Sequence, residues 1–156
     1  MAPSAAVQRT TGVYLDGEPN EEVSAGDQWI LGPPDHSITA PEADPSHASA
    51  TFYVDGGTWI LRFVAPSGEA LAEGTTYQAT NGVPTQGVGV LWVGGDGRGC
   101  ARATGALTVH EVQFDGSGLL VHVDADFTQQ CDDGRDAVLF GSLRFAALRP
   151  LRALTA

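Results

Sequence analysis

The segment ALTVHEVQFDGSGLLVHVDADFTQ, residues 106–129, decides the fold that the sequence predicts. Apolar and polar side chains alternate along both halves of it, and Asp115-Gly116-Ser117-Gly118 separates the two halves. Alternation with a period of two is typical of strands, and a glycine-containing turn between two such runs predicts a hairpin. The return strand should therefore have two distinct faces, with Val121, Val123, Ala125 and Phe127 inward and His122, Asp124 and Asp126 outward.

The same alternation recurs along the rest of the chain and predicts about nine short strands. With 20 glycines and 9 prolines, the sequence leaves few uninterrupted windows for helices. We expect one helical turn at Ser67–Glu73, anchored by Leu71, and a long surface loop from Leu31 to Ala48. The predicted strands are Gly12–Asp16, Asp27–Leu31, Ser49–Val54, Thr58–Val64, Thr76–Ala79, Gly87–Val93, Ala106–Phe114, Leu119–Gln129 and Asp136–Leu148.

These strands predict an all-β fold, a two-sheet antiparallel β-sandwich of the jelly-roll kind. One domain should span residues 12–148, between a flexible N-terminal segment (residues 1–11) and a C-terminal tail (residues 149–156). Hydrophobic residues make up 42% of the 156-residue chain, which is enough for one core.

The charge balance argues against two classes of partner. The chain has 19 acidic and 8 basic residues, a net charge of −11, and every basic residue is an arginine. Such an acidic protein repels phosphate backbones, so we expect no nucleic-acid partner. No window approaches the roughly 20 apolar residues of a membrane span, so we also expect no membrane insertion.

The two cysteines, Cys100 and Cys131, bear on the compartment. An even number of cysteines in a small, glycine-rich chain favours a disulfide and an extracellular or cell-surface location. The alternative is a pair of unpaired buried thiols in a cytoplasmic protein. Residues 1–11 lack the apolar core of a secretion signal, so either the protein stays inside the cell or a signal preceded this start.

Three segments carry a resemblance to other proteins: GDGRGC at 95–100, ADFTQQC at 125–131 and LFGSLRF at 139–145. Together they resemble an uncharacterised bacterial domain with GDGRGC and ADFxQxC motifs, found mostly in predicted extracytoplasmic proteins. The resemblance covers residues 12–145 and implies a β-sandwich with one disulfide. It carries over no catalytic residue, because the activity of that family is unknown. Ala101 departs from it, since a small polar residue is expected there.

Acidic residues suggest a calcium hypothesis. Carboxylates that alternate along one strand lie about 6–7 Å apart and offer the oxygen ligands that Ca²⁺ prefers. If the hairpin closes symmetrically, Glu111 should lie beside His122 on the same face. The alternative, which we favour, is a solvated outer face on which the charges maintain solubility. The candidate Ca²⁺ ligands are Asp96, Asp124, Asp126, Asp132 and Asp133.

Tryptophans next to acidic residues suggest a carbohydrate site, because sugar rings stack on indoles while their hydroxyls bind polar groups. Trp92 is the best exposed candidate, since glycines surround it in the sequence. The alternative is that the tryptophans are core residues. The candidate ligand-binding residues are Trp59, Trp92, Glu111 and His122.

The sequence therefore predicts a small non-enzymatic binding module for a carbohydrate or a protein partner, with Ca²⁺ as the one candidate cofactor. The alternative is an assembly protein that associates through its edge strands. A third hypothesis is a polysaccharide hydrolase that uses Glu111, Asp124 and Asp126 as acid and base. No catalytic residue is predicted, because the chain has no GxSxG elbow and no phosphate-binding loop.

Overall fold

The structure, a computed structural model, describes residues 9–39, 45–54, 56–95, 97–132 and 137–148. These residues form ten strands and no helix, which confirms the all-β prediction. No segment among them is a helix long and apolar enough to cross a membrane. The strands are β1 (Thr10–Gly17), β2 (Gln28–Leu31), β3 (Ile38–Thr39), β4 (His47–Val54), β5 (Gly57–Val64), β6 (Thr75–Thr80), β7 (Gly89–Gly95), β8 (Ala103–Phe114), β9 (Leu120–Cys131) and β10 (Val138–Ala147).

All ten strands belong to one sheet, in the order β2-β1-β10-β9-β8-β6-β7-β5-β4-β3. Strand β6 joins the two halves, since it pairs antiparallel with β8 and parallel with β7. Every other pairing is antiparallel. The two separate sheets of the expected jelly-roll-like sandwich are therefore not confirmed, because hydrogen bonding continues from one half to the other.

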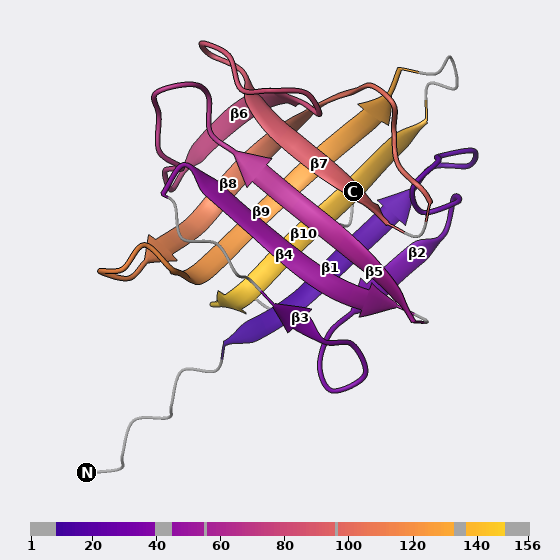
Figure 1. Cartoon of the computed structure of the whole chain (residues 1–156). Helices are drawn as coiled ribbons and strands as arrows, with labels where there is room; N and C mark the ends of the chain where they lie inside the picture. Colours follow the sequence, from indigo (N-terminus) through magenta and orange to yellow (C-terminus); the bar gives the residue numbers. More distant parts are fainter. Residues whose placement is uncertain (1–8, 40–44, 55, 96, 133–136, 149–156) are drawn as a thin grey trace.

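The sheet is strongly curled, as its connections require. Strands β2 and β3 are its opposite edges, yet only residues 32–37 join them. A connection of this length spans at most about 25 Å, so the two edges must approach each other. In Figure 1, β4, β5 and β7 cross in front of β8, β9, β10 and β1. We call the line where β2 approaches β4 and β5 the seam.

Residues inside the curled sheet form one hydrophobic core. Phe63 of β5 and Phe127 of β9 meet across it, with ring centroids 5.9 Å apart. Glycine is required at position 141 beside them, because a Cβ there would lie 2.2 Å from the Phe127 ring. Val123 and Ala125 are also buried, as the alternation predicted, whereas Val121 is half-buried.

The central hairpin forms as predicted, but with a different register. Its turn is held by Asp115, whose Oδ1 accepts hydrogen bonds from the backbone amides of Ser117 and Leu119. The register shifts twice along β8 and β9, so Glu111 lies opposite Asp124 and not opposite His122. The expected pairing of Glu111 with His122 is therefore wrong, because a symmetric hairpin contains no such shifts.

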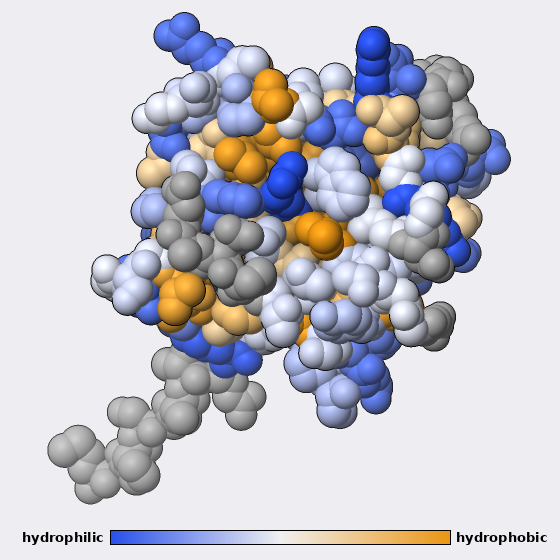
Figure 2. Space-filling model, viewed as in Figure 1, coloured by the Kyte–Doolittle hydropathy of each residue, from blue (hydrophilic) through white to orange (hydrophobic). Residues whose placement is uncertain are grey.

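Two local predictions within the loops were also wrong. Ser67–Glu73 contains no helix, although Leu71 is 6% exposed and anchors the loop as expected. The loop from Leu31 to Ala48 is interrupted by β3 and ends where β4 begins. On the face that Figure 2 shows, hydrophobic side chains form separate small patches within a largely hydrophilic surface.

Candidate functional site

A pocket of about 390 Å³ opens at the seam. Its volume lies within the range of small-ligand sites, roughly 300–1,000 Å³. Trp29 of β2 and Trp59 of β5 meet edge to face in its wall, with ring centroids 4.9 Å apart. Other lining side chains include Gln28, Ile30, His36 and Arg98. We call this site the seam pocket.

The turn that follows β7 places Arg98 over both indoles. Gly95 and Arg98 exchange two backbone hydrogen bonds of 2.8 and 2.9 Å, and Gly97 has a φ of +76°. Gly95 lies directly against Trp59, because a Cβ at position 95 would be 2.6 Å from the ring. The guanidinium carbon of Arg98 is consequently 5.5 Å from the Trp29 centroid and 5.9 Å from the Trp59 centroid. These are cation–π distances.

The loop between β1 and β2 supports Arg98 from the other side. Glu21 is 3% exposed, and its carboxylate accepts hydrogen bonds from the backbone amides of Val23 and Ser24 and from the Ser24 hydroxyl. This fixes the loop so that the Val23 carbonyl accepts a hydrogen bond of 3.5 Å from Arg98. The Arg98 position is thus determined by two indoles and one carbonyl.

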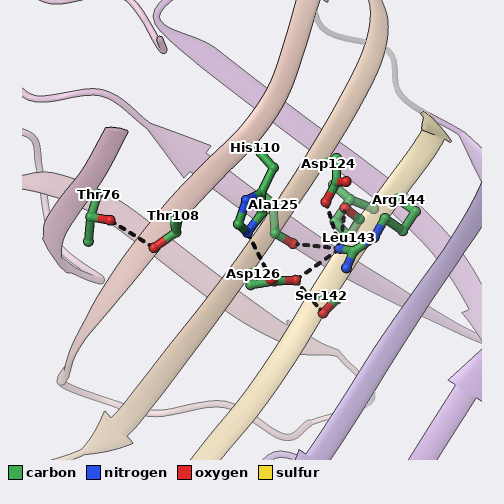
Figure 3. Close-up of polar contacts among 9 residues, drawn as sticks. All are labelled: Thr76, Thr108, His110, Asp124, Ala125, Asp126, Ser142, Leu143 and Arg144. Atoms are coloured by element: carbon green, nitrogen blue, oxygen red, sulfur yellow. Dashed lines mark hydrogen bonds and ion pairs between the residues drawn. The ribbon is translucent and has the colours of Figure 1, made fainter. Parts of the chain in front are cut away.

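A second polar site lies on the outer face of β8, β9 and β10 (Figure 3). Arg144 and Asp124 form a buried ion pair of 3.0 Å, with side chains 3% and 2% exposed. The same Arg144 nitrogen contacts Asp126 at 3.0 Å. Asp126 also accepts a 2.7 Å hydrogen bond from the Ser142 hydroxyl and lies 2.9 Å from His110 Nε2.

This network contains serine, histidine and aspartate, but their order differs from that of a catalytic triad. In a triad the imidazole lies between the hydroxyl and the carboxylate. Here the Asp126 carboxylate lies between Ser142 and His110, and Ser142 is fully buried. Ser142 therefore donates to a carboxylate, and its oxygen is not accessible to a substrate.

Three of the acidic residues proposed for Ca²⁺ or for acid–base chemistry, Glu111, Asp124 and Asp126, lie on neighbouring positions of β8 and β9. Asp124 and Asp126 both contact Arg144, so both carboxylates already have a cation as partner. Asp132 is exposed at the end of β9, and Asp96 and Asp133 lie outside the described residues. Within the described ranges, no group of three or more His, Cys, Asp or Glu side chains is placed to hold a metal ion. Calcium binding stays a prediction.

Glu111 and His122 have different partners. Glu111 binds Arg9 at 3.3 Å and accepts a hydrogen bond from the Leu148 amide. His122 pairs with Gln113, and its buried Nδ1 has no hydrogen-bond partner among the described residues. Neither residue lines the seam pocket.

The two candidate tryptophans lie on opposite faces of the sheet. Trp59 is 2% exposed and belongs to the core, the alternative that the sequence also offered, and it contributes to the wall of the seam pocket. Trp92 is half-buried and pairs with Arg62 of β5 on the outer face. Its role in ligand binding stays a prediction.

The predicted disulfide is confirmed. Cys100 and Cys131 are bonded, with Cα atoms 5.3 Å apart, and the described chain has no free cysteine. Since Cys100 follows Arg98 by two residues, the bridge ties the Arg98 turn to the end of β9. This constraint helps to hold the guanidinium at the seam.

Sequence reasoning missed Trp29, Arg98 and Arg144 as interacting residues. The glycines around Arg98 indicated a tight turn, but only the curling of the sheet brings that turn to Trp29. The alternation in β10 placed Arg144 on a polar face, and the β9–β10 register places it opposite Asp124.

Comparisons with protein-family models, curated proteins and solved structures find no match to this chain.

Proposed function

We propose that the protein is a small, non-enzymatic binding module that takes up a carbohydrate ligand in the seam pocket. The observation that carries the proposal is the position of Arg98 over Trp29 and Trp59 at the wall of a 390 Å³ pocket. An exposed indole offers an apolar surface to the C–H face of a sugar, and guanidinium, amide and imidazole groups bond to its hydroxyls.

The accessible chemistry of the pocket supports this ligand class. Trp29 is half-buried, so part of its indole remains accessible to an incoming molecule. Gln28 adds a side-chain amide, which also donates a 3.0 Å hydrogen bond to the Tyr14 hydroxyl. Such a mixture of apolar surface and a few fixed polar groups is typical of small-ligand sites.

We propose a secreted or cell-surface location in a bacterium for this module. The disulfide is compatible with that environment, because such bonds persist in oxidising compartments. A net charge of −11 favours a soluble, self-repelling protein and disfavours nucleic acids and anionic membranes as partners.

The alternative function is assembly through edge strands. The edge strands β2 and β3 contain four and two residues, and short edges offer few free backbone groups to a partner strand. Light scattering across a hundredfold concentration range distinguishes the two functions. We expect a monomer throughout, whereas ligand-independent, concentration-dependent association would favour assembly.

The proposal is tested with a panel of neutral and acidic oligosaccharides, titrated against the protein by isothermal calorimetry. We expect at least one glycan to bind, and Trp29→Leu to abolish that binding because the leucine cannot form the aromatic wall. The matched control is Trp92→Leu, which removes an indole from the outer face. Binding lost only in the Trp92 variant, or absent for every glycan, would reject the seam pocket as the carbohydrate site.

A further inference from the structure

We infer that the seam pocket is selective for an acidic sugar, a pyranose ring that carries a carboxylate, which Arg98 recognises. This inference rests on the proposed function and adds the ligand's charge. Among the described residues that line the pocket, Arg98 is the only one with a permanent charge. A pocket whose one fixed charge is a cation favours a ligand that places a carboxylate against that cation.

The guanidinium of Arg98 has hydrogen-bonding capacity to spare. It carries five N–H donors, and within the described chain its one side-chain hydrogen bond is the long 3.5 Å contact with the Val23 carbonyl. No described carboxylate lies within ion-pair distance of it. Arg144 provides the contrast, because its Nη1 contacts two carboxylates and two carbonyls. Arg144 is thus paired with two carboxylates, whereas Arg98 has no such anionic partner among the described residues.

Two described carboxylates, those of Glu21 and Glu22, line a second recess that Arg98 also borders. The Glu21 oxygens are already held by the amides of Val23 and Ser24 and by the Ser24 hydroxyl. The Glu21 carboxylate is therefore hydrogen-bonded within its own loop. The side of Arg98 that faces the seam pocket remains open to a ligand.

The geometry suits a planar anion on a ring. A guanidinium forms paired, parallel hydrogen bonds with a carboxylate, which an ammonium cannot reproduce. Its plane is stabilised by the two indoles, so little side-chain entropy is lost when the ligand binds. The partly exposed Trp29 next to it can then contact the ring that carries the carboxylate.

The test compares a galacturonate trisaccharide with the same trisaccharide as its methyl ester, which has the same rings but no charge. We expect the acid to bind the wild-type protein about ten- to a hundredfold more tightly than the ester. Raising the salt concentration from 0.05 to 0.5 M should weaken binding of the acid and leave binding of the ester unchanged.

Substitutions assign the preference to Arg98. Arg98→Gln should remove the preference for the acid, and Arg98→Lys should restore only part of it, because lysine keeps the charge but loses the planar pair of donors. Arg62→Gln is the matched control, since Arg62 is exposed beside Trp92 on the outer face. If an Arg98 variant does not fold, the comparison of acid and ester on the wild-type protein still shows whether the pocket prefers the acid.

The outcomes separate this inference from the proposed function. Equal affinity for acid and ester, with binding still dependent on Trp29, would overturn the inference and leave a neutral-sugar module. An acid preference that survives Arg98→Gln in a folded variant would also overturn it. Binding of neither compound, nor of any glycan in the wider panel, would overturn both.

Discussion

Replacing Arg144 by methionine should destabilise the protein strongly. The Asp124 carboxylate would remain in a site where it is only 2% exposed, without the cation that lies 3.0 Å away. Removal of one partner of a buried ion pair costs about 3–5 kcal/mol, because the remaining charge stays desolvated without its counter-charge. For a domain of this size we expect the melting temperature to fall by roughly 6–20 °C.

The assay is urea unfolding of the oxidised protein, followed by circular dichroism and tryptophan fluorescence. The matched control is Arg9→Met, because Arg9 also contacts a carboxylate, that of Glu111, but with side chains 32% and 18% exposed. Such a pair contributes at most about 1 kcal/mol. A second substitution, Asp124→Leu, should recover most of the stability lost by Arg144→Met, since both buried charges are then absent. An Arg144→Met loss no larger than that of Arg9→Met would refute this reasoning.

Three further predictions concern the disulfide, calcium and anionic polymers. Cys100→Ser should lower the free energy of unfolding by roughly 3–4 kcal/mol, because the bridge closes a loop over a separation of 31 residues and so limits the entropy of the unfolded chain. Two free thiols in protein purified without reductant would contradict the bridge. Melting curves in EDTA, Mg²⁺ and Ca²⁺ at fixed ionic strength should coincide, because Asp124 and Asp126 already have Arg144 as their cation. A rise of several degrees specific to Ca²⁺ would support a calcium site. Filter-binding and flotation assays at physiological salt should detect no complex with DNA, RNA or anionic vesicles, because the net charge of −11 repels them. A salt-sensitive micromolar complex would show that this net charge conceals a basic patch.

Local features of this fold follow from the sequence because they depend on neighbouring residues. The alternation in β5 correctly places Trp59, Leu61 and Phe63 in the core. The Asp115–Gly118 turn closes the predicted hairpin through bonds within five residues. In both cases the periodicity of two and the turn chemistry act over short distances.

Long-range features could not be derived in the same way. A two-sheet sandwich and one curled sheet produce the same alternation of apolar and polar residues along their strands. In this protein the feature that joins the two halves into one sheet is the parallel pairing of β6 with β7, which involves only Ala79–Gly89 and Thr80–Val90. The shift of Glu111 from His122 to Asp124 results from two irregularities that leave no clear mark in the sequence.

The candidate site shows the same limit. The seam pocket needs β2 and β5 to meet, although they lie at different ends of the sheet order. Arg98 lay within a segment recognised as a tight turn, but its role depends on an indole 69 positions earlier in the chain. Aromatic and basic residues in separate segments give no signal of proximity until the topology is known.

The central claim is that the ligand binds at the seam, and the three tryptophans of the chain provide a direct test of it. Each indole N–H gives one signal in an amide-correlation NMR spectrum, and single substitutions assign the three signals. We expect a galacturonate trisaccharide to shift the signals of Trp29 and Trp59 in a saturable manner and to leave that of Trp92 in place. A shift confined to Trp92, or no shift of any indole signal at saturating ligand, would contradict the central claim.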